Sequence, residues 1–303
     1  MYEIRFPNLG ITLKNVKDGF VIGNFEIRFY GVIIALSFIA AYLVMATEAK
    51  RTKQDPELYL DYILWLVIPA ILGARIYYVL FSLKDYIKKG QGVGATIKGM
   101  FNIRGGGLAV YGGIIAGIIT LVIFAKIRKQ KLTLMLDTCC MGVLAGQILG
   151  RWGNFFNREA FGGYTNSLFA MAIPSDWFGG KNYLVTKANL GIITQDMIDN
   201  VTTFDEKEFI QVHPTFLYES LWNALVLLVI FLYRRHKKFD GELCAMYLWG
   251  YGLGRVWIES LRTDSLMLPV GNFKVSQLLA ALCVVIATIY IVVMRMKHNK
   301  DKQ

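Results

Sequence analysis

Residues 29–47 read FYGVIIALSFIAAYLVMAT and contain no Asp, Glu, Lys or Arg. Residues 105–125 and 275–294 are equally free of charge. Each segment approaches the roughly 20 residues that a helix needs to cross a hydrocarbon core about 30 Å thick. Further apolar segments, with only one or two charges each, are 62–83, 132–150, 213–233 and 243–261. The sequence therefore predicts an all-α polytopic membrane protein with seven transmembrane helices.

The composition excludes a soluble globular protein and a disordered chain. Charged residues make up 18% of the 303 positions, against about 25% in a typical soluble domain. Hydrophobic residues make up 55%. No signal peptide is expected, because residues 1–28 mix polar and charged side chains and lack a short apolar core. We interpret residues 1–303 as a single membrane domain.

The distribution of Lys and Arg predicts the orientation, because cytoplasmic loops of membrane proteins are enriched in both. Their density is several times higher in one set of hydrophilic segments than in the other. The dense segments are 48–57, 126–132, 234–241 and 295–303, and the sparse ones are 1–28, 82–107, 150–212 and 261–274. We therefore predict an outer N-terminus, an inner C-terminus and a small external head at about 163–212. The net charge of +11 then reflects topology and attraction to anionic lipid, and no nucleic-acid partner is expected.

The sequence predicts no metal site and no cofactor. The chain has only three histidines, and its cysteines lie inside predicted spans, without a zinc-type spacing or a disulfide framework. These cysteines are Cys139, Cys140, Cys244 and Cys283. We interpret them as small packing residues.

Glycines recur every four residues inside two predicted spans, at Gly113 and Gly117 and at Gly142, Gly146 and Gly150. This spacing of small residues lets helices approach closely in lipid. The consecutive glycines at 105–107 weaken a helix and predict an irregular start to the third span.

Ionisable side chains inside a span are costly and are therefore functional candidates. In the predicted spans they are Arg75, Asp137, Glu219, Arg255 and Glu259, with Arg151 at an outer end. The alternative interpretation is a set of buried structural pairs, or side chains that reach the interface. This alternative stays open for Arg75 and Asp137.

Tyr251, Arg255 and Glu259 are spaced by four residues and share one helix face. Arg255 lies in the outer half of the bilayer, roughly 18 Å from Leu243 at about 1.5 Å per residue. Arg151 lies at a similar level on another span. Two guanidiniums at one depth favour an anion between them, although Glu259 could instead pair with Arg255. The planar fork of arginine suits phosphate, and in a membrane the phosphate carrier is a phospholipid head group.

Residues 150–162 read GRWGNFFNREAFG, and this string resembles the signature G-R-x-G-N-F-x-N-x-E-x-x-G of the prolipoprotein diacylglyceryl transferase family. Asp137 lies fourteen residues before Arg151, as in that family. Other similar motifs are RFYG at 28–31, HPTFLYE at 213–219, and GYGLGR at 250–255 followed by Glu259 and Arg262. The resemblance covers nearly the whole chain except residues 163–212.

The resemblance implies a transferase of the bacterial cytoplasmic membrane that needs no cofactor. Such enzymes move the diacylglyceryl group of phosphatidylglycerol onto the lipobox cysteine of a prolipoprotein signal peptide. A thioether forms and glycerol phosphate is released. Because the attacking sulfur belongs to the substrate, the enzyme needs no cysteine nucleophile of its own. The partners implied are phosphatidylglycerol and prolipoprotein signal peptides with a lipobox cysteine.

The resemblance also implies roles for individual residues. Arg151 and Arg255 are assigned to the phosphate, and Tyr111 to thiol orientation or proton transfer. Substrate binding, or support of the arginine rotamers, is assigned to Tyr30, Asn154, Asn157, Glu159, Gly162, Glu219, Tyr251 and Glu259. A structural or undetermined role is left for Arg75, Asp137, Arg104 and Arg262.

The chain departs from the family at Tyr111. Residues 106–113 read GGLAVYGG and resemble the third-span motif, in which many members carry His at this position. A tyrosine hydroxyl ordinarily titrates near pH 10 and is a weak base at neutral pH, although it can orient a thiol. The general base therefore stays open, and Arg104 is a charged group near Tyr111 in the sequence.

Two other functions remain as alternatives. A membrane transporter or channel for a small anion could line its path with Arg75, Arg151 and Arg255. Inverted repeats or paired broken helices are expected in that class, and the sequence shows neither. A different lipid-modifying transferase would use another acceptor, such as a sugar, an amine or glycerol phosphate.

Overall fold

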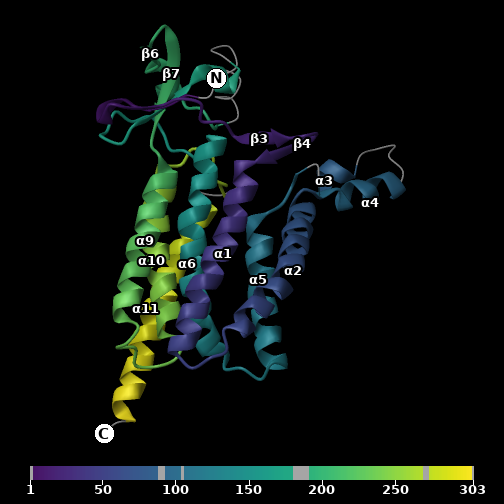
Figure 1. The fold of residues 1–303 in the computed structure, drawn as a ribbon, viewed down its shortest axis with the longest axis vertical. Coiled ribbons are helices and arrows are strands. Elements are labelled where there is room, and N and C mark those ends of the chain that lie inside the picture. Colours follow the sequence, from purple (N-terminus) through teal and green to yellow (C-terminus); the bar gives the residue numbers. More distant parts are fainter. Residues whose placement is uncertain (1–2, 88–92, 104–105, 180–190, 269–272, 302–303) are drawn as a thin grey trace. The chain divides into compact units, whose positions relative to one another are not determined.

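In the computed structural model, residues 3–87, 93–103, 106–179, 191–268 and 273–301 are described. Long helices account for most of them (Figure 1). They are α1 (Phe29–Arg51), α2 (Glu57–Phe81), α5 (Val110–Ile127), α6 (Leu132–Asn157), α9 (Thr215–Tyr233), α10 (Glu242–Leu261) and α11 (Val275–Lys300). Each predicted span coincides with one of these helices, so the prediction of a mostly helical polytopic membrane protein is confirmed.

Within the described residues, six helices are long and apolar enough to cross a membrane. α10 is not among them. It carries Glu242, Arg255 and Glu259 along its 20 residues, and charged side chains oppose insertion of a helix into the bilayer. The described chain thus has six candidate spans.

The prediction that the protein is all-α is wrong, because the described residues also form two β-sheets. A five-stranded antiparallel sheet has the strand order β2-β1-β5-β7-β6. Its strands are β1 (Ile4–Phe6), β2 (Ile11–Leu13), β5 (Met171–Pro174), β6 (Thr202–Phe204) and β7 (Lys207–Val212). Arg5 of β1 pairs with Ala172 of β5, so the N-terminal residues belong to the same sheet as the predicted head segment. A separate two-stranded sheet consists of β3 (Gly19–Ile22) and β4 (Phe25–Arg28).

The five-stranded sheet shares its apolar core with the ends of two long helices. Ile4, Ile173 and Ile210 are completely buried between them. Phe155 of α6 and Phe216 of α9 join this core, with ring centroids 5.0 Å apart. The core therefore fixes the end of α6 and the start of α9, where the candidate site lies.

The chain forms two compact units, one of residues 1–44 and 139–303 and the other of residues 45–138. In the second unit α2 and α5 pack closely through Gly73 and Gly112, because a Cβ added at Gly112 would overlap the carbonyl oxygen of Gly73. The short helices α3 (Leu83–Tyr86) and α4 (Val93–Phe101) lie between α2 and α5 in the sequence. Close helix packing at glycines thus occurs in this unit, but at Gly73 and Gly112 and not at the predicted Gly113, whose added Cβ would meet its nearest atom at 3.5 Å.

In the first unit, glycines of α10 permit contacts on two sides of that helix. Gly250 faces Val226 of α9, and a Cβ added at Gly252 would lie 2.9 Å from the Ala280 carbonyl oxygen of α11. The Trp222 indole of α9 donates a hydrogen bond to the Gly250 carbonyl oxygen at 2.8 Å. α10 is thereby held between α9 and α11.

The contact between α2 and α5 yields a prediction from two adjacent glycines. Gly112→Ala should lower the free energy of unfolding by about 1–3 kcal/mol, the usual cost of overpacking. Gly113→Ala is the matched control, because its Cβ would meet the nearest atom, the Ala70 carbonyl oxygen, at 3.5 Å. It should be neutral or stabilising, since Ala favours a helix over Gly by up to about 1 kcal/mol. Thermal unfolding in detergent compares the two, and equal stability of both variants would contradict the close contact.

Candidate active site

A carboxylate on α9 connects two arginines from the neighbouring helices. Glu219 Oε2 lies 2.7 Å from Arg151 Nη2 of α6. Glu219 Oε1 lies 2.7 Å from Arg255 Nη1 of α10. The two guanidiniums that we expect at one depth are therefore close together, and the anion between them is a side chain of the protein itself.

Arg255 has a second carboxylate partner on its own helix. Arg255 Nη2 lies 2.6 Å from Glu259 Oε2, and the Ser276 hydroxyl of α11 donates to Glu259 Oε1 at 2.7 Å. The side chains of Glu219 and Glu259 are only 4% and 2% exposed. Breaking a buried ion pair of this kind typically costs about 3–5 kcal/mol. We call Arg151, Arg255, Glu219 and Glu259 the arginine cluster, and its formal charges balance.

Arg151 is the more accessible of the two arginines, with 20% of its side chain exposed. Among the residues that the structure describes, Glu219 is its one ion-pair partner. A guanidinium carries five N–H donors in a fixed fork. Most donors of Arg151 are therefore available to an anionic ligand.

α6 ends in a strained turn that directs Glu159 back towards its own helix. Arg158 and Ala160, on either side of it, have φ values of 50° and 57°. This left-handed conformation costs a non-glycine residue about 1–2 kcal/mol. Glu159 Oε1 accepts hydrogen bonds from Asn154 Nδ2 at 3.1 Å and from Asn157 Nδ2 at 3.2 Å. The string at 150–162 thus forms a carboxylate site at the end of α6, held by two amides.

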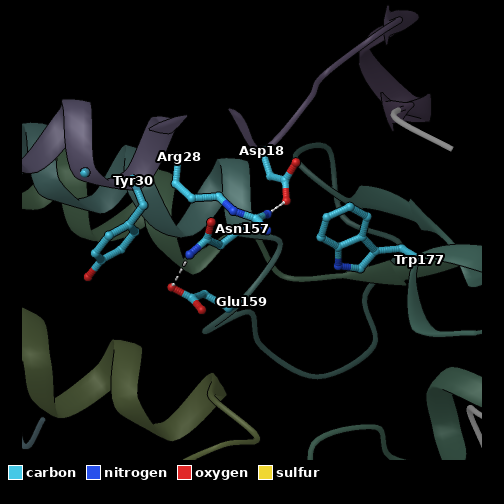
Figure 2. A pocket seen from close by; sticks show the side chains of 7 residues that line it. Asp18, Arg28, Tyr30, Asn157, Glu159 and Trp177 are labelled. Carbon is cyan, nitrogen blue, oxygen red and sulfur yellow. Dashed lines mark hydrogen bonds and ion pairs between the residues drawn. The ribbon is translucent and has the colours of Figure 1, made fainter. Parts of the chain in front are cut away.

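A pocket of about 420 Å³ opens beside this turn (Figure 2). It is lined by Asp18, Arg28, Tyr30, Gly31, Asn157, Glu159 and Trp177. In Figure 2 the Arg28–Asp18 ion pair lies between the Asn157–Glu159 pair and Trp177. Tyr30, Asn157 and Glu159, all predicted to bind substrate, therefore line one pocket. The Tyr30 ring packs on Gly153 of α6, where an added Cβ would lie 2.7 Å from it, and Gly153 is two residues from Arg151, so this pocket adjoins the arginine cluster.

Sequence reasoning missed Arg158, which is 2% exposed. Its guanidinium donates to the carbonyl oxygens of Val16 and Phe156 and lies 4.1 Å from the centroid of the Trp177 ring. Because Trp177 lines the pocket, Arg158 positions one of its walls. Its place directly before Glu159 is the only signal in the sequence. Asp18 and Trp177 were also missed, because they reach the pocket from other segments of the chain, and Arg28, which begins the RFYG motif, was assigned no role.

Local contacts account for the residue types at three further predicted positions, namely Gly162, Arg262 and Tyr251. The Gly162 N–H donates to the His213 carbonyl oxygen at 2.9 Å, and a Cβ at Gly162 would lie 2.7 Å from the His213 Cβ. The backbones of Arg262 and Gly162 form an isolated antiparallel β-bridge. The Arg262 guanidinium donates two hydrogen bonds to the Asp264 carboxylate, at 3.0 and 2.9 Å. The ring of Tyr251 stacks on a tyrosine one turn earlier in α10, with centroids 5.7 Å apart.

Tyr111 and Asp137 belong to the second unit. Tyr111 lies in the first turn of α5, and its half-buried ring is 6.3 Å from that of Tyr77 of α2. Asp137 is 2% exposed within α6. Arg104 lies outside the described residues. The roles of these residues stay predictions.

Arg75 organises the segment before α5. Its guanidinium donates to four backbone carbonyl oxygens, those of Met100 at 2.7 Å, Gly106 at 2.6 Å, Gly107 at 2.8 Å and Gly99 at 2.9 Å. Gly106 and Gly107 have φ values of 85° and 80°, which only glycine adopts at low cost. The irregular start of the third span is confirmed for these two glycines, and the structural interpretation of Arg75 is supported.

Comparison with known proteins identifies one family over most of the chain. A family profile described as "Prolipoprotein diacylglyceryl transferase" matches residues 18–293. This range includes the whole arginine cluster and every residue that lines the pocket.

Individual relatives are similar over nearly their full length. The chain is 36% identical to phosphatidylglycerol–prolipoprotein diacylglyceryl transferase 1 of Clostridium perfringens over 286 residues, which cover 94% of this chain and 96% of the relative. It is 37% identical to the phosphatidylglycerol–prolipoprotein diacylglyceryl transferase of Listeria innocua over 278 residues, or 92% of this chain and 89% of the relative. The protein of the same description from Clostridioides difficile is 36% identical over 286 residues, or 94% and 97% of the two chains.

Proposed function

The chain belongs to the prolipoprotein diacylglyceryl transferase family, and we propose that its arginine cluster holds the phosphate of phosphatidylglycerol during the transfer. The chain is a membrane transferase that modifies prolipoproteins with a diacylglyceryl group. Its substrates are therefore phosphatidylglycerol and prolipoproteins. The roles of individual residues in the following paragraphs are parts of the proposal.

The reaction needs a nucleophile and a stabilised leaving group. In the proposed step, the sulfur of a lipobox cysteine attacks the glyceryl CH2 that carries the phosphate. A C–S bond forms, the C–O bond breaks, and glycerol phosphate leaves with the electron pair of that bond, while the thiol proton passes to a base. A thiol that titrates near pH 8.5 needs only modest activation. Negative charge gathers on the departing phosphate, so donors fixed around it supply a large part of the catalysis.

The observation that carries this proposal is the pair of arginines on one buried carboxylate. Glu219 fixes both guanidiniums before any substrate binds, so little reorganisation is needed when charge develops. Arg151 presents its remaining N–H donors, and a guanidinium fork can donate two parallel hydrogen bonds to a phosphate. Arg255, tied to two carboxylates, contributes positive charge in a fixed orientation.

We assign the glycerol head group to the pocket of Figure 2. Its volume of about 420 Å³ lies within the range of roughly 300–1,000 Å³ for small-molecule sites. The hydroxyls of a glycerol can donate to the Glu159 carboxylate and accept from amide or phenol donors. Asn157 and Tyr30 provide such donors. Tyr30 also packs on Gly153, two residues from Arg151, which supports one continuous site for phosphate and glycerol.

We also propose seven crossings of a bacterial cytoplasmic membrane, with the N-terminus outside and the C-terminus inside. The pairing of β1 with β5 supports an even number of crossings between the N-terminal strand and the head. The backbone bridge between Gly162 and Arg262 supports a return to the same side between the start of α9 and the end of α10. If α9 crosses, α10 must then cross back. Prolipoproteins would present their lipobox cysteine on this outer side.

Labelling of single introduced cysteines checks the orientation. Glu206→Cys, in the head, should react with a membrane-impermeant maleimide on intact cells. Asn299→Cys, near the end of α11, should react only after the membrane is permeabilised. The native cysteines lie within helices and provide a low background. Reaction of both positions on intact cells would contradict the proposed orientation.

Substitutions of the arginines test the phosphate site. Arg151→Gln and Arg255→Gln should each lower the transfer rate by roughly 10²–10³-fold, the usual effect of removing a donor to a developing anion. Lysine at either position should restore only part of the rate, because a point charge lacks the bidentate fork. The assay is transfer from phosphatidylglycerol to a lipobox peptide by purified protein. Arg128→Gln is the control, since it breaks an exposed arginine–carboxylate pair with Asp61 outside the site. Full activity of either site variant would remove that arginine from the mechanism.

The hydroxyl of Tyr111 is tested by Tyr111→Phe, which keeps the ring. If the hydroxyl takes part in proton transfer, its removal should lower the transfer rate by roughly 10²-fold or more. Tyr111→His should remain active and lose activity below a pH near about 6.5. Near-normal rates of Tyr111→Phe at every pH would assign the ring to packing against Tyr77. Glu159 or Glu219 would then be the next candidate base.

A further inference from the structure

The hairpin of β3 and β4 has one face made entirely of apolar side chains. Its register pairs Phe20 with Ile27 and Ile22 with Phe25. Paired residues, and residues two apart along a strand, point to the same side of a sheet. We call Phe20, Ile22, Phe25 and Ile27 the apolar hairpin face. The opposite face carries Val21, Glu26 and Arg28.

This face is exposed in the part of the chain that the structure describes. Phe25 is 77% exposed, Ile22 is 60% exposed and Phe20 is 40% exposed. The hairpin forms a sheet of its own and does not join the five-stranded sheet. An isolated two-stranded hairpin is marginal in water, and contiguous exposed apolar side chains usually mark a contact surface. We therefore expect the apolar hairpin face to contact another surface.

The position of the hairpin indicates what covers it. β4 ends at Arg28 and α1 begins at Phe29, without an intervening residue. α1 is one of the candidate membrane spans, and the hairpin lies at the end where this helix begins (Figure 1). The hairpin is thus attached to the point at which the chain enters the bilayer. Its opposite face bears the Arg28–Glu26 ion pair at 2.9 Å, as expected of an element that is half in water.

We propose that the β3–β4 hairpin lies in the lipid interface beside α1, with the apolar hairpin face in contact with acyl chains and its other face in water. Amphipathic elements of this kind bury their apolar side at the boundary between head groups and acyl chains. Phenylalanine is typical of the apolar side of such elements. This membrane contact does not depend on the assignment of the pocket.

The same hairpin reaches the pocket through its base. Arg28, the last residue of β4, lines the pocket together with Asp18, its ion-pair partner. A row of rings, Phe20 to Phe29 at 5.6 Å and Phe29 to Phe156 at 5.1 Å, connects the hairpin to α1 and α6. If the pocket holds the head group, as proposed above, the inserted hairpin keeps its opening at the level of the lipid head groups.

Spin labels on the two faces test the membrane contact. Single cysteines replace Ile22 and Phe25 on the apolar face and Val21 and Glu26 on the other, in full-length protein with Cys244→Ala and Cys283→Ala. Val21 and Ile22 are a matched pair, because they are adjacent and similarly exposed, at 68% and 60%. The protein is placed in nanodiscs of phosphatidylglycerol and phosphatidylethanolamine. Collision of each nitroxide with oxygen, which concentrates in lipid, is compared with collision with a water-soluble nickel chelate.

The proposal predicts that labels at 22 and 25 collide several-fold more with oxygen, relative to nickel, than labels at 21 and 26. Equal ratios at all four positions would overturn it. Protection of 22 and 25 only after a lipobox peptide is added would assign the face to the peptide substrate and would also overturn it. These readouts do not depend on enzyme activity, so they are independent of the proposed site.

Kinetics test the connection to the pocket. Ile22→Ser combined with Phe25→Ser should raise the KM for phosphatidylglycerol, measured as mole fraction in the bilayer, by several-fold and leave kcat nearly unchanged. Val21→Ser is the control and should change neither. If the KM is unchanged while the spin labels show the predicted accessibility, the proposed connection between the hairpin and the pocket is overturned. The membrane contact of the hairpin then remains supported.

Discussion

One buried carboxylate, that of Glu219, is shared by guanidiniums on two other helices, and the arrangement of the first unit depends on it. Small residues allow helices to approach closely in lipid, but they permit several alignments along the helix axes. An ion pair buried away from water has a steep cost when broken. Because Glu219 contacts Arg151 and Arg255 at 2.7 Å each, it selects a single alignment of α6, α9 and α10. The glycines of α10 then make that alignment sterically possible.

The last two turns of α6 combine most of the candidate site. Arg151 contributes to the arginine cluster, and Asn154 and Asn157 hold the Glu159 carboxylate three to eight residues further along. The strained turn that follows is compensated by Arg158, whose buried guanidinium bonds to backbone oxygens and packs on Trp177. A single helix end can therefore position charge for a phosphate and acceptors for hydroxyl groups.

Much of this arrangement could be predicted from the sequence, because a bilayer imposes strong and simple constraints. Uncharged segments identify helices, and the cost of charge in lipid identifies Arg255 and Glu219 as special. Strands of three or four residues, such as β1 and β5, give no comparable pattern, and their partners are about 165 residues apart. The bonds of Arg75 to carbonyl oxygens were equally hidden, because backbone acceptors have no sequence signature. Pocket residues from the hairpin depend on register, which a single sequence does not reveal.

The sheet also constrains how the protein is made. β1 precedes the first membrane span, but its partner β5 follows α6 in the sequence. At typical synthesis rates of about 5–20 residues per second, β5 is synthesised on the order of 10–30 s after the N-terminal strands. During that time one edge of β1 is unpaired, and such edges favour aggregation. If α1, α2, α5 and α6 cross the membrane as proposed, closure of the sheet requires these four helices to have delivered both strands to one side of the bilayer. On that topology, the finished sheet is a check on the insertion of these four helices, because a chain in which one of them failed to cross could not complete it.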